Sequence, residues 1–200
     1  MGSGPAPELA VDGSDALKPD HLLALFEHAR KACGHTDYVV VGSLAILGLD
    51  DEDIVPAGMT MSIDIDCYTR TDPERIFELK EALGEGSDFH VRHGYYLDPV
   101  SSKLPTLPDG WEGRMNQLER QGLRIWFLDP NDAAISKYAR GEPKDLSWIR
   151  AGIEAGIVSL PIVRARLRDT SFIDDTESLR VKNQLERDSA WFGSLRARRN

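Results

Sequence analysis

Two aspartates placed two residues apart are the part of this sequence best suited to chemistry. They lie in the run SIDIDCY, residues 62–68, where apolar and polar residues alternate as in a half-buried β-strand. Side chains alternate between the two faces of a strand, so Asp64 and Asp66 share one face with Ser62 and Tyr68. Their Cα atoms would be roughly 6.5–7 Å apart at a rise of ~3.3 Å per residue. The two carboxylates can therefore converge on a hard cation such as Mg²⁺. The alternative is an ordinary half-exposed strand, although Asp is disfavoured in strands.

A glycine–serine turn precedes this strand and offers a phosphate-binding element. Residues 38–41 form a short apolar run typical of a buried strand, and Gly42 and Ser43 end it before a predicted helix at 44–49. Glycine lets the backbone approach a phosphate closely, and the amides at a helix N-terminus favour an anion. For these two residues alone, a plain strand–helix turn with Ser43 as its cap is the alternative. The order of the two motifs is more specific than either motif.

This order resembles the signature of the nucleotidyltransferase superfamily with the polymerase β-like core. That signature is an apolar strand, Gly-Gly or Gly-Ser, a short helix, and then Asp-x-Asp or Asp-x-Glu on the next strand. More closely, residues 128–146 resemble the C-terminal helical motif of bacterial proteins related to the AbiEii toxin group. The resemblance covers about residues 36–168. The interval between the motifs, residues 44–63, is longer than is usual in the superfamily, and the acidic loop 50–58 is its apparent insertion.

The resemblance implies a metal-dependent transfer of a nucleoside monophosphate from an NTP to an acceptor hydroxyl. Under it, Asp64 and Asp66 hold Mg²⁺ or Mn²⁺, and Gly42 and Ser43 cradle the β and γ phosphates. Lys137 would then neutralise charge on the leaving pyrophosphate.

A third carboxylate completes the metal site of the superfamily, and its place in this chain is not obvious. The predicted strand at 123–128 contains no acid. We assign the role to Asp98, which closes the preceding predicted strand. A turn residue at the end of that strand is the alternative for Asp98.

Three further residues are candidates for the site. Arg114, just after Trp111-Glu112-Gly113, is a candidate phosphate contact. Lys144 and Asp145 accompany Lys137 in the helical motif, and Asp145 is expected to have a structural or a site role. The alternative to a role in the site is that Lys137 and the pair Lys144-Asp145 form a salt bridge between two helices.

Two other functions stay open at this stage. A catalytically silent module that binds a nucleotide or a partner would fit the lack of a clear third acid. A toxin of a toxin–antitoxin pair, with tRNA or a protein as its acceptor and a cognate antitoxin as its partner, is permitted by the resemblance.

From the helices and strands expected around these residues we predict an α+β domain. The order of these elements along the chain resembles that of an α/β fold. The domain would have a small mixed sheet flanked by helices over residues 16–128 and a helical part, 129–200, packed on this core. Residues 1–15 read as a flexible leader. The expected helices are 20–34, 44–49 and 72–83, and the expected strands are 38–41, 61–68, 88–98 and 123–128, with a loop between the last two.

Composition limits the classes of protein that the chain can belong to. Apolar residues make up 41% of its 200 positions and charged residues 28%, which is typical of a globular domain. The net charge of −9 argues against a protein that coats nucleic acid without specificity. The sequence shows no apolar run of membrane length, no signal peptide and only two cysteines. We therefore expect a cytoplasmic protein.

Overall fold

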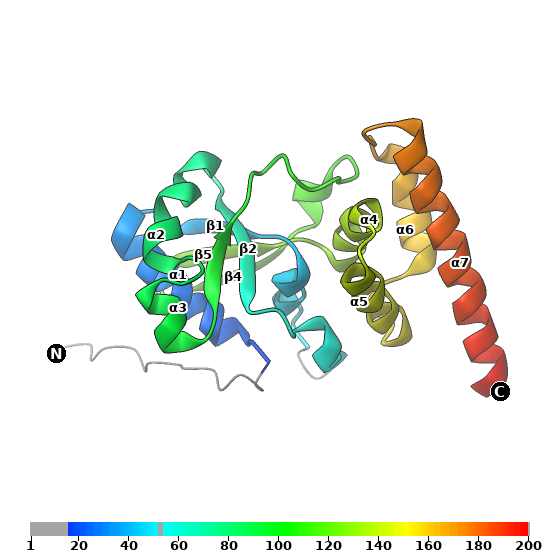
Figure 1. The fold of residues 1–200 in the computed structure, drawn as a ribbon, viewed down its shortest axis with the longest axis horizontal. Helices are drawn as coiled ribbons and strands as arrows, with labels where there is room; N and C mark the ends of the chain where they lie inside the picture. Colours follow the sequence, from blue (N-terminus) through cyan, green and yellow to red (C-terminus); the bar gives the residue numbers. More distant parts are fainter. Residues whose placement is uncertain (1–15, 52–53, 200) are drawn as a thin grey trace.

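Five strands of the chain form one mixed β-sheet (Figure 1). The computed structural model describes residues 16–51 and 54–199, so the predicted leader and residues 52 and 53 of the acidic loop lie outside it. The strand order is β3-β2-β1-β5-β4. The strands are β1 (Asp37–Val40), β2 (Asp64–Thr69), β3 (Tyr96–Pro99), β4 (Asn116–Arg120) and β5 (Leu123–Phe127). The predicted α+β fold with a small mixed sheet is confirmed.

The central strand β1 brings the two predicted motifs together. It runs antiparallel to β2 and parallel to β5, and β2 in turn runs parallel to β3. Val41, which follows β1, donates its backbone N–H to the carbonyl oxygen of Asp66 at 2.9 Å. On the other side of β2, Asp66 is the register partner of Asp98. The end of β1, the first half of β2 and the end of β3 therefore lie side by side.

Helix α1 (Pro19–Cys33) packs on the sheet through an apolar stripe. The ring of Phe26 in this stripe stacks on that of Tyr38 in β1, with 4.3 Å between the ring centroids. Gly34 ends the helix in the left-handed conformation, at φ 78°. The stripe consists of Leu22, Leu25, Phe26 and Ala29, all fully buried.

The prediction of a strand over residues 88–98 is wrong for its first half. Helix α3 (Asp88–His93) occupies it, and β3 follows. The side chain of Ser87 accepts the backbone N–H of His90 at 3.2 Å, and Gly94 ends the helix at φ 79°. A serine cap and a left-handed glycine therefore outweigh the β-rich composition of the run.

Strand β4 lies in a stretch predicted as loop. It pairs with β5 through the two-residue turn Gln121-Gly122, whose φ angles are 56° and 75°. Two positive φ angles are those of the type I′ turn that suits the twist of a hairpin. All residues of β4 except Leu118 are polar, so its sequence lacks the apolar alternation that predicts a strand.

Two of the predicted α-helices are mainly tighter 3₁₀ helices. Helix η1 (Ser43–Gly48) replaces the one expected at 44–49, and η4 (Pro73–Leu79) with the one-turn α2 (Lys80–Leu83) replaces the one expected at 72–83. Further 3₁₀ turns are η3 (Ala57–Met59) and η5 (Trp111–Arg114).

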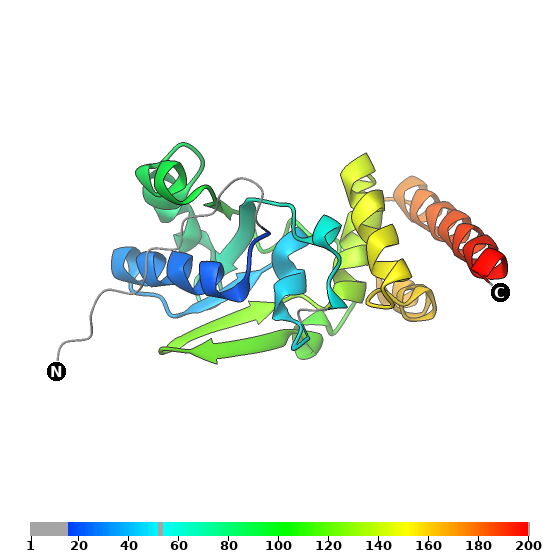
Figure 2. The same ribbon diagram turned by 90° about the horizontal axis from the view of Figure 1, so that it is seen from below.

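The C-terminal third of the chain is helical. It contains α4 (Pro130–Arg140), α5 (Pro143–Glu154), α6 (Leu160–Arg166), the turn η6 (Leu167–Asp169) and α7 (Asp175–Arg199). Figures 1 and 2 show the sheet and its flanking helices at one end of the long axis, α7 at the other end, and α4 and α5 between them. Within the described residues, no helix has both the length and the apolar character of a membrane span.

Candidate active site

Three carboxylates converge where β2 and β3 run side by side. One oxygen from each of Asp64, Asp66 and Asp98 lies within 4.8 Å of the others, and all three residues are partly buried. Asp64 and Asp66 stand on the same face of β2, since they are two residues apart. The parallel register that pairs Asp66 with Asp98 puts the third carboxylate on that face as well. Asp98, the assignment that the sequence left open, thus lies with the predicted pair.

The glycine of the Gly-Ser turn touches this cluster. Gly42 has a left-handed φ of 69°, and a Cβ atom built on it would lie 1.9 Å from Oδ2 of Asp66. Only a residue without a side chain fits this position. The turn that was predicted to bind phosphate therefore lies in direct contact with a predicted metal ligand.

The electrostatics of the cluster reflect its burial and its excess of negative charge. Burial, followed by the charges of Asp64 and Asp98, raises the pKa of Asp66 to about 7. Burial and the charge of Asp64 also raise the pKa of Asp98, while the charge of Lys80 opposes this rise. A bound cation would relieve this repulsion, because it favours the ionised form of every carboxylate around it.

Lys137 connects the Gly-Ser turn to the C-terminal helices. Its side chain is buried, at 4% exposure, and its Nζ donates to the hydroxyl of Ser43 at 2.9 Å. Nζ also lies 3.4 Å from Oδ1 of Asp145 and 4.9 Å from the centroid of the Trp148 ring. Burial lowers the pKa of Lys137, and the charge of Asp145 opposes that shift. The lysine is therefore held next to the turn by partners on both sides.

Arg140 is a residue of this region that the sequence analysis did not identify. Its Nε donates to Oδ2 of Asp145 at 2.7 Å, and its Nη2 donates to Oδ1 of the same carboxylate. Although burial opposes ionisation of Asp145, the bonds from Arg140 and the charge of Lys137 lower the pKa of this carboxyl group. Lys137 and Arg140 are three residues apart on α4 and so lie on one face of the helix. That spacing is the signal that could have revealed Arg140.

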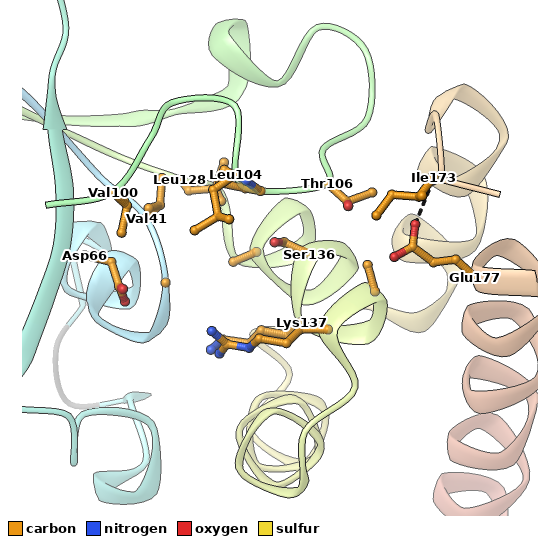
Figure 3. A pocket seen from close by; sticks show the side chains of 15 residues that line it. Val41, Asp66, Val100, Leu104, Thr106, Leu128, Ser136, Lys137, Ile173 and Glu177 are labelled. Atoms are coloured by element: carbon orange, nitrogen blue, oxygen red, sulfur yellow. Dashed lines mark hydrogen bonds between the residues drawn. The ribbon is translucent and has the colours of Figure 1, made fainter. Parts of the chain in front are cut away.

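A pocket of about 240 Å³ opens beside Asp66 (Figure 3). Gly42 and Asp66 border it, and Lys137 and Arg140 line it from α4. Figure 3 shows Lys137 extending toward the side where Asp66 lies, with Glu177 at the opposite end. The rest of the lining is largely apolar and includes Val41, Val100, Leu104, Pro105, Leu128 and Ile173.

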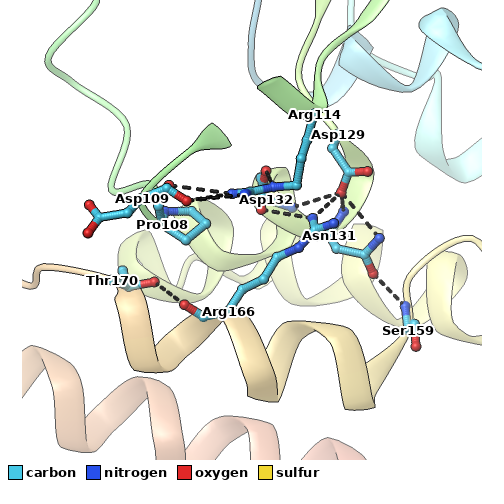
Figure 4. A network of polar contacts seen from close by, with 9 residues as sticks. All are labelled: Pro108, Asp109, Arg114, Asp129, Asn131, Asp132, Ser159, Arg166 and Thr170. Carbon is cyan, nitrogen blue, oxygen red and sulfur yellow. Dashed lines mark hydrogen bonds and ion pairs between the residues drawn. The ribbon is translucent and has the colours of Figure 1, made fainter. Parts of the chain in front are cut away.

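Two candidates from the sequence lie outside this arrangement. The guanidinium of Arg114 donates to Asp132 at 2.8 Å and to the carbonyl of Asp109 at 3.1 Å (Figure 4). It thereby joins a network that ties the loop before β4 to the start of α4. The side chain of Lys144 is 71% exposed and pairs with Glu142 at 3.6 Å. We leave both residues out of the proposed site.

Comparison with known proteins identifies the family. The family described as a nucleotidyltransferase of unknown function (DUF6036) matches residues 20–199. The chain belongs to this family. The match includes both the sheet and the C-terminal helices, and it supports the superfamily suggested by the sequence. No curated protein and no solved structure matches the chain. The relation to the AbiEii group stays a prediction.

The donor set of the cluster fits the kind of cation that nucleotidyltransferases generally use. Its three carboxylates are hard oxygen ligands, which suit Mg²⁺ and Mn²⁺ better than they suit soft metals. Burial and the charges of Asp64 and Asp98 raise the pKa of Asp66 although the charges of Lys137 and Arg140 oppose the rise, and a bound cation would favour the ionised carboxylate. The residues therefore form a possible acidic site for a divalent cation.

Proposed function

We propose that this protein transfers a nucleoside monophosphate from an NTP to an acceptor hydroxyl. The observation that carries the proposal is the contact between two elements that the family uses together. The Gly42-Ser43 turn lies against the carboxylate of Asp66, and Lys137 donates to Ser43 from the other side. Asp66 of the acidic cluster thus lines one pocket together with Gly42 and with Lys137, a cation for a triphosphate.

Each residue has a role that follows from its surroundings. Asp64, Asp66 and Asp98 would hold Mg²⁺ or Mn²⁺, which when bound screens the charge of the triphosphate and stabilises the attacking and leaving oxygens. Gly42 and Ser43 would cradle the β and γ phosphates, because a glycine backbone and a hydroxyl can approach phosphate oxygens closely.

The cations of α4 would act on the leaving group. In the reaction, the bond between the α-phosphorus and the pyrophosphate oxygen breaks, and a bond from the acceptor oxygen to that phosphorus forms. Lys137 and Arg140 would neutralise charge that develops on the pyrophosphate. Asp145 would hold both cations in place, since it is fully buried and contacts each of them. Asp98, with its raised pKa, would help to take the proton of the acceptor hydroxyl.

The apolar part of the pocket would receive the nucleoside. Ligand pockets are mostly apolar, with a few polar groups that fix the orientation of the ligand. The walls at Val100, Leu104 and Leu128 provide the apolar surface, and the α4 cations lie beside them. A triphosphate at the acidic cluster would therefore direct its base toward the C-terminal helices.

The silent-module alternative is weakened by the position of Asp98. That alternative rested on the lack of a clear third acid in the sequence. A carboxylate within 4.8 Å of the predicted pair supports the enzyme over the silent module.

Transfer of label from α-³²P NTPs tests the proposed reaction. The acceptors offered should be the protein itself, total tRNA and small hydroxylated compounds, each with Mg²⁺ or Mn²⁺. We expect transfer by the wild type, no transfer by Asp64→Asn or Asp66→Asn, and a fall of about 10²–10³-fold in Lys137→Ala. Lys144→Ala is the matched control and should retain wild-type activity. Nucleotide binding by the wild type without transfer to any acceptor would favour the silent module.

Asp98→Ala separates the two alternatives for the third carboxylate. If Asp98 completes the site, the variant should bind the NTP but lose turnover by at least about 10²-fold, because one ligand and one proton acceptor are missing. Equilibrium binding of a non-hydrolysable NTP and the transfer assay measure the two effects. Full turnover in a folded variant would refute the assignment.

A further inference from the structure

Ser62 makes a hydrogen bond that the proposed reaction does not yet use. This residue lies two positions before Asp64, just ahead of β2, and is half-buried. Its hydroxyl donates to Oδ1 of Asp64. The bond joins a neutral side chain to one carboxylate of the acidic cluster.

The three carboxylates of the cluster are held in different ways. Asp66 is confined because Gly42 packs directly against its Oδ2. Asp98 is placed by the parallel register of β3, which pairs it with Asp66 of β2. Asp64 lies at the first position of β2, where the strand begins, and its carboxylate is fixed through Ser62. Without that donor, rotation of the Asp64 side chain would carry its oxygens away from the other two acids.

We propose that Ser62 is a positioning residue for the divalent cation. Its hydroxyl occupies one oxygen of Asp64 and holds the carboxylate in a single orientation, so that an oxygen remains directed at the cluster. The inference rests on the proposed function, because it requires a cation held by Asp64, Asp66 and Asp98. Partners of this kind orient metal-ligating groups in many sites, and losing one typically weakens metal affinity or activity by 10–100-fold.

A purely structural role would give a different result. A serine at the start of a strand can simply satisfy a local backbone or side-chain group, and its loss would then lower stability without changing cation affinity. The decisive quantity is therefore the affinity of the folded, metal-free protein for a cation, measured without substrate.

The test is calorimetric titration of the metal-free wild type and variants with Mn²⁺. We expect Ser62→Ala to weaken Mn²⁺ binding about tenfold, within the range for lost ligand-orienting partners. Ser62→Thr, which keeps the hydroxyl, should stay within about twofold of the wild type, whereas its isostere Ser62→Val should resemble Ser62→Ala. If Ser62→Ala does not fold, comparing Ser62→Thr with Ser62→Val still tests whether the hydroxyl supports Mn²⁺ binding. Ser194→Ala, an exposed serine near the C-terminal end of α7, is the control and should bind as the wild type does.

Two outcomes would overturn the proposal, and they can be told apart. Wild-type Mn²⁺ affinity in both Ser62→Ala and Ser62→Val, with binding lost in Asp64→Asn, would refute the role of Ser62 and leave the cation site intact. No Mn²⁺ binding by the wild type, or unchanged binding in Asp64→Asn, would refute the cation site and Ser62 with it.

Discussion

Asp66 combines three constraints at one side chain. It faces two other carboxylates, it is packed against Gly42, and burial raises its pKa to about 7. A metal-free protein at neutral pH would therefore carry this group as a mixture of acid and carboxylate. Because a cation needs the ionised form, its binding should release part of a proton near pH 7 and should tighten as the pH rises through that value.

The same shift predicts how stability depends on pH. The folded pKa of Asp66 lies above its usual value, so ionisation destabilises the metal-free fold. That penalty is absent below about pH 4 and complete above about pH 7, and it amounts to roughly 2–4 kcal/mol. Asp66→Asn should therefore raise the free energy of unfolding much more at pH 8 than at pH 4.5, where only a small part of the penalty is present. Urea titrations in EDTA at the two pH values measure it, and equal effects of the substitution at both would contradict the prediction.

Gly42→Ala tests whether the turn and the acid act as one unit. The added Cβ would collide with Asp66 and would sit at an unfavourable φ, so we expect the cation-induced thermal shift to disappear and stability to fall by about 1–3 kcal/mol. Gly34→Ala is a matched control. It has a similar φ of +78° but open space around it, and should lose stability alone. A normal cation response in Gly42→Ala would show that the contact is dispensable.

The residue types of the site could be predicted better than their contacts. Asp64, Asp66, Gly42 and Ser43 belong to local motifs, and local spacing determines which face of a strand they occupy. The three-residue spacing of Arg140 from Lys137 is a local signal too, whereas its bonds to Asp145 depend on how α4 packs against α5. Arg114 was misleading. Its place just after Trp111-Glu112-Gly113 suggests a phosphate contact, whereas its bond to Asp132 directs the guanidinium toward the start of α4.

At the level of elements, α4, α5 and α7 are joined by a buried carboxylate. Asp188 of α7 is fully buried, and it accepts hydrogen bonds at 2.9 Å from Tyr138 of α4 and from Arg150 of α5. This network fixes the helix that carries Lys137 and Arg140. Pocket geometry on one side of α4 thus depends on packing on its other side.

Asp188→Ala should loosen this three-helix contact. It leaves a buried hydroxyl without its acceptor, which typically costs about 1–3 kcal/mol, and we expect a lower melting temperature. Tyr138→Phe should cost less, and the double variant should fall short of the sum because the two groups share one bond. Asn183→Ala, an exposed change on the same helix, is the control. Additive effects of the two substitutions would contradict a shared contact.

Elements were predictable where local signals agreed. Helix α1 has an apolar stripe with a terminating glycine, and the central strands are apolar runs. The predictions were wrong where a helix cap or a turn favoured a different element from the one that the residue composition indicated. The Ser87 cap favours helix α3 where the composition predicted a strand. The Gln121-Gly122 turn pairs the polar residues of β4 with β5 where the sequence predicted a loop. The spacing of apolar residues could not predict that η1 and η4 are 3₁₀ helices. Over so few residues, the i,i+3 spacing of a 3₁₀ helix cannot be told from the i,i+4 spacing of an α-helix.

For the whole molecule, the pocket joins parts that are distant in the chain. Its lining includes Gly42 and Asp66 from the sheet region, Ile173 from the segment before α7, and Glu177 from the first turn of α7. Mg²⁺ with a non-hydrolysable NTP should therefore slow amide hydrogen exchange at both ends of the pocket. Saturation at 100 times Kd should add about 2.7 kcal/mol of stability.

Hydrogen exchange followed by mass spectrometry measures this effect segment by segment. We expect protection over residues 41–47 and 64–67, and also over 173–178. Lys137→Ala should reduce the protection at every segment, because it weakens binding as a whole. Protection confined to the sheet segments would show that the ligand does not reach α7.

The position of β3 at the edge of the sheet has a consequence for thermal inactivation of the protein. β3 is a four-residue strand at the margin of the sheet, paired on one side by β2, and it carries Asp98. Strands of this kind open locally at a fraction of the energy needed to unfold a domain. The proposed turnover thus depends on an acid whose strand is paired on one side only. On heating, activity would be lost while most of the helices are still folded. A bound cation would delay this loss, because its ligands come from both β2 and β3.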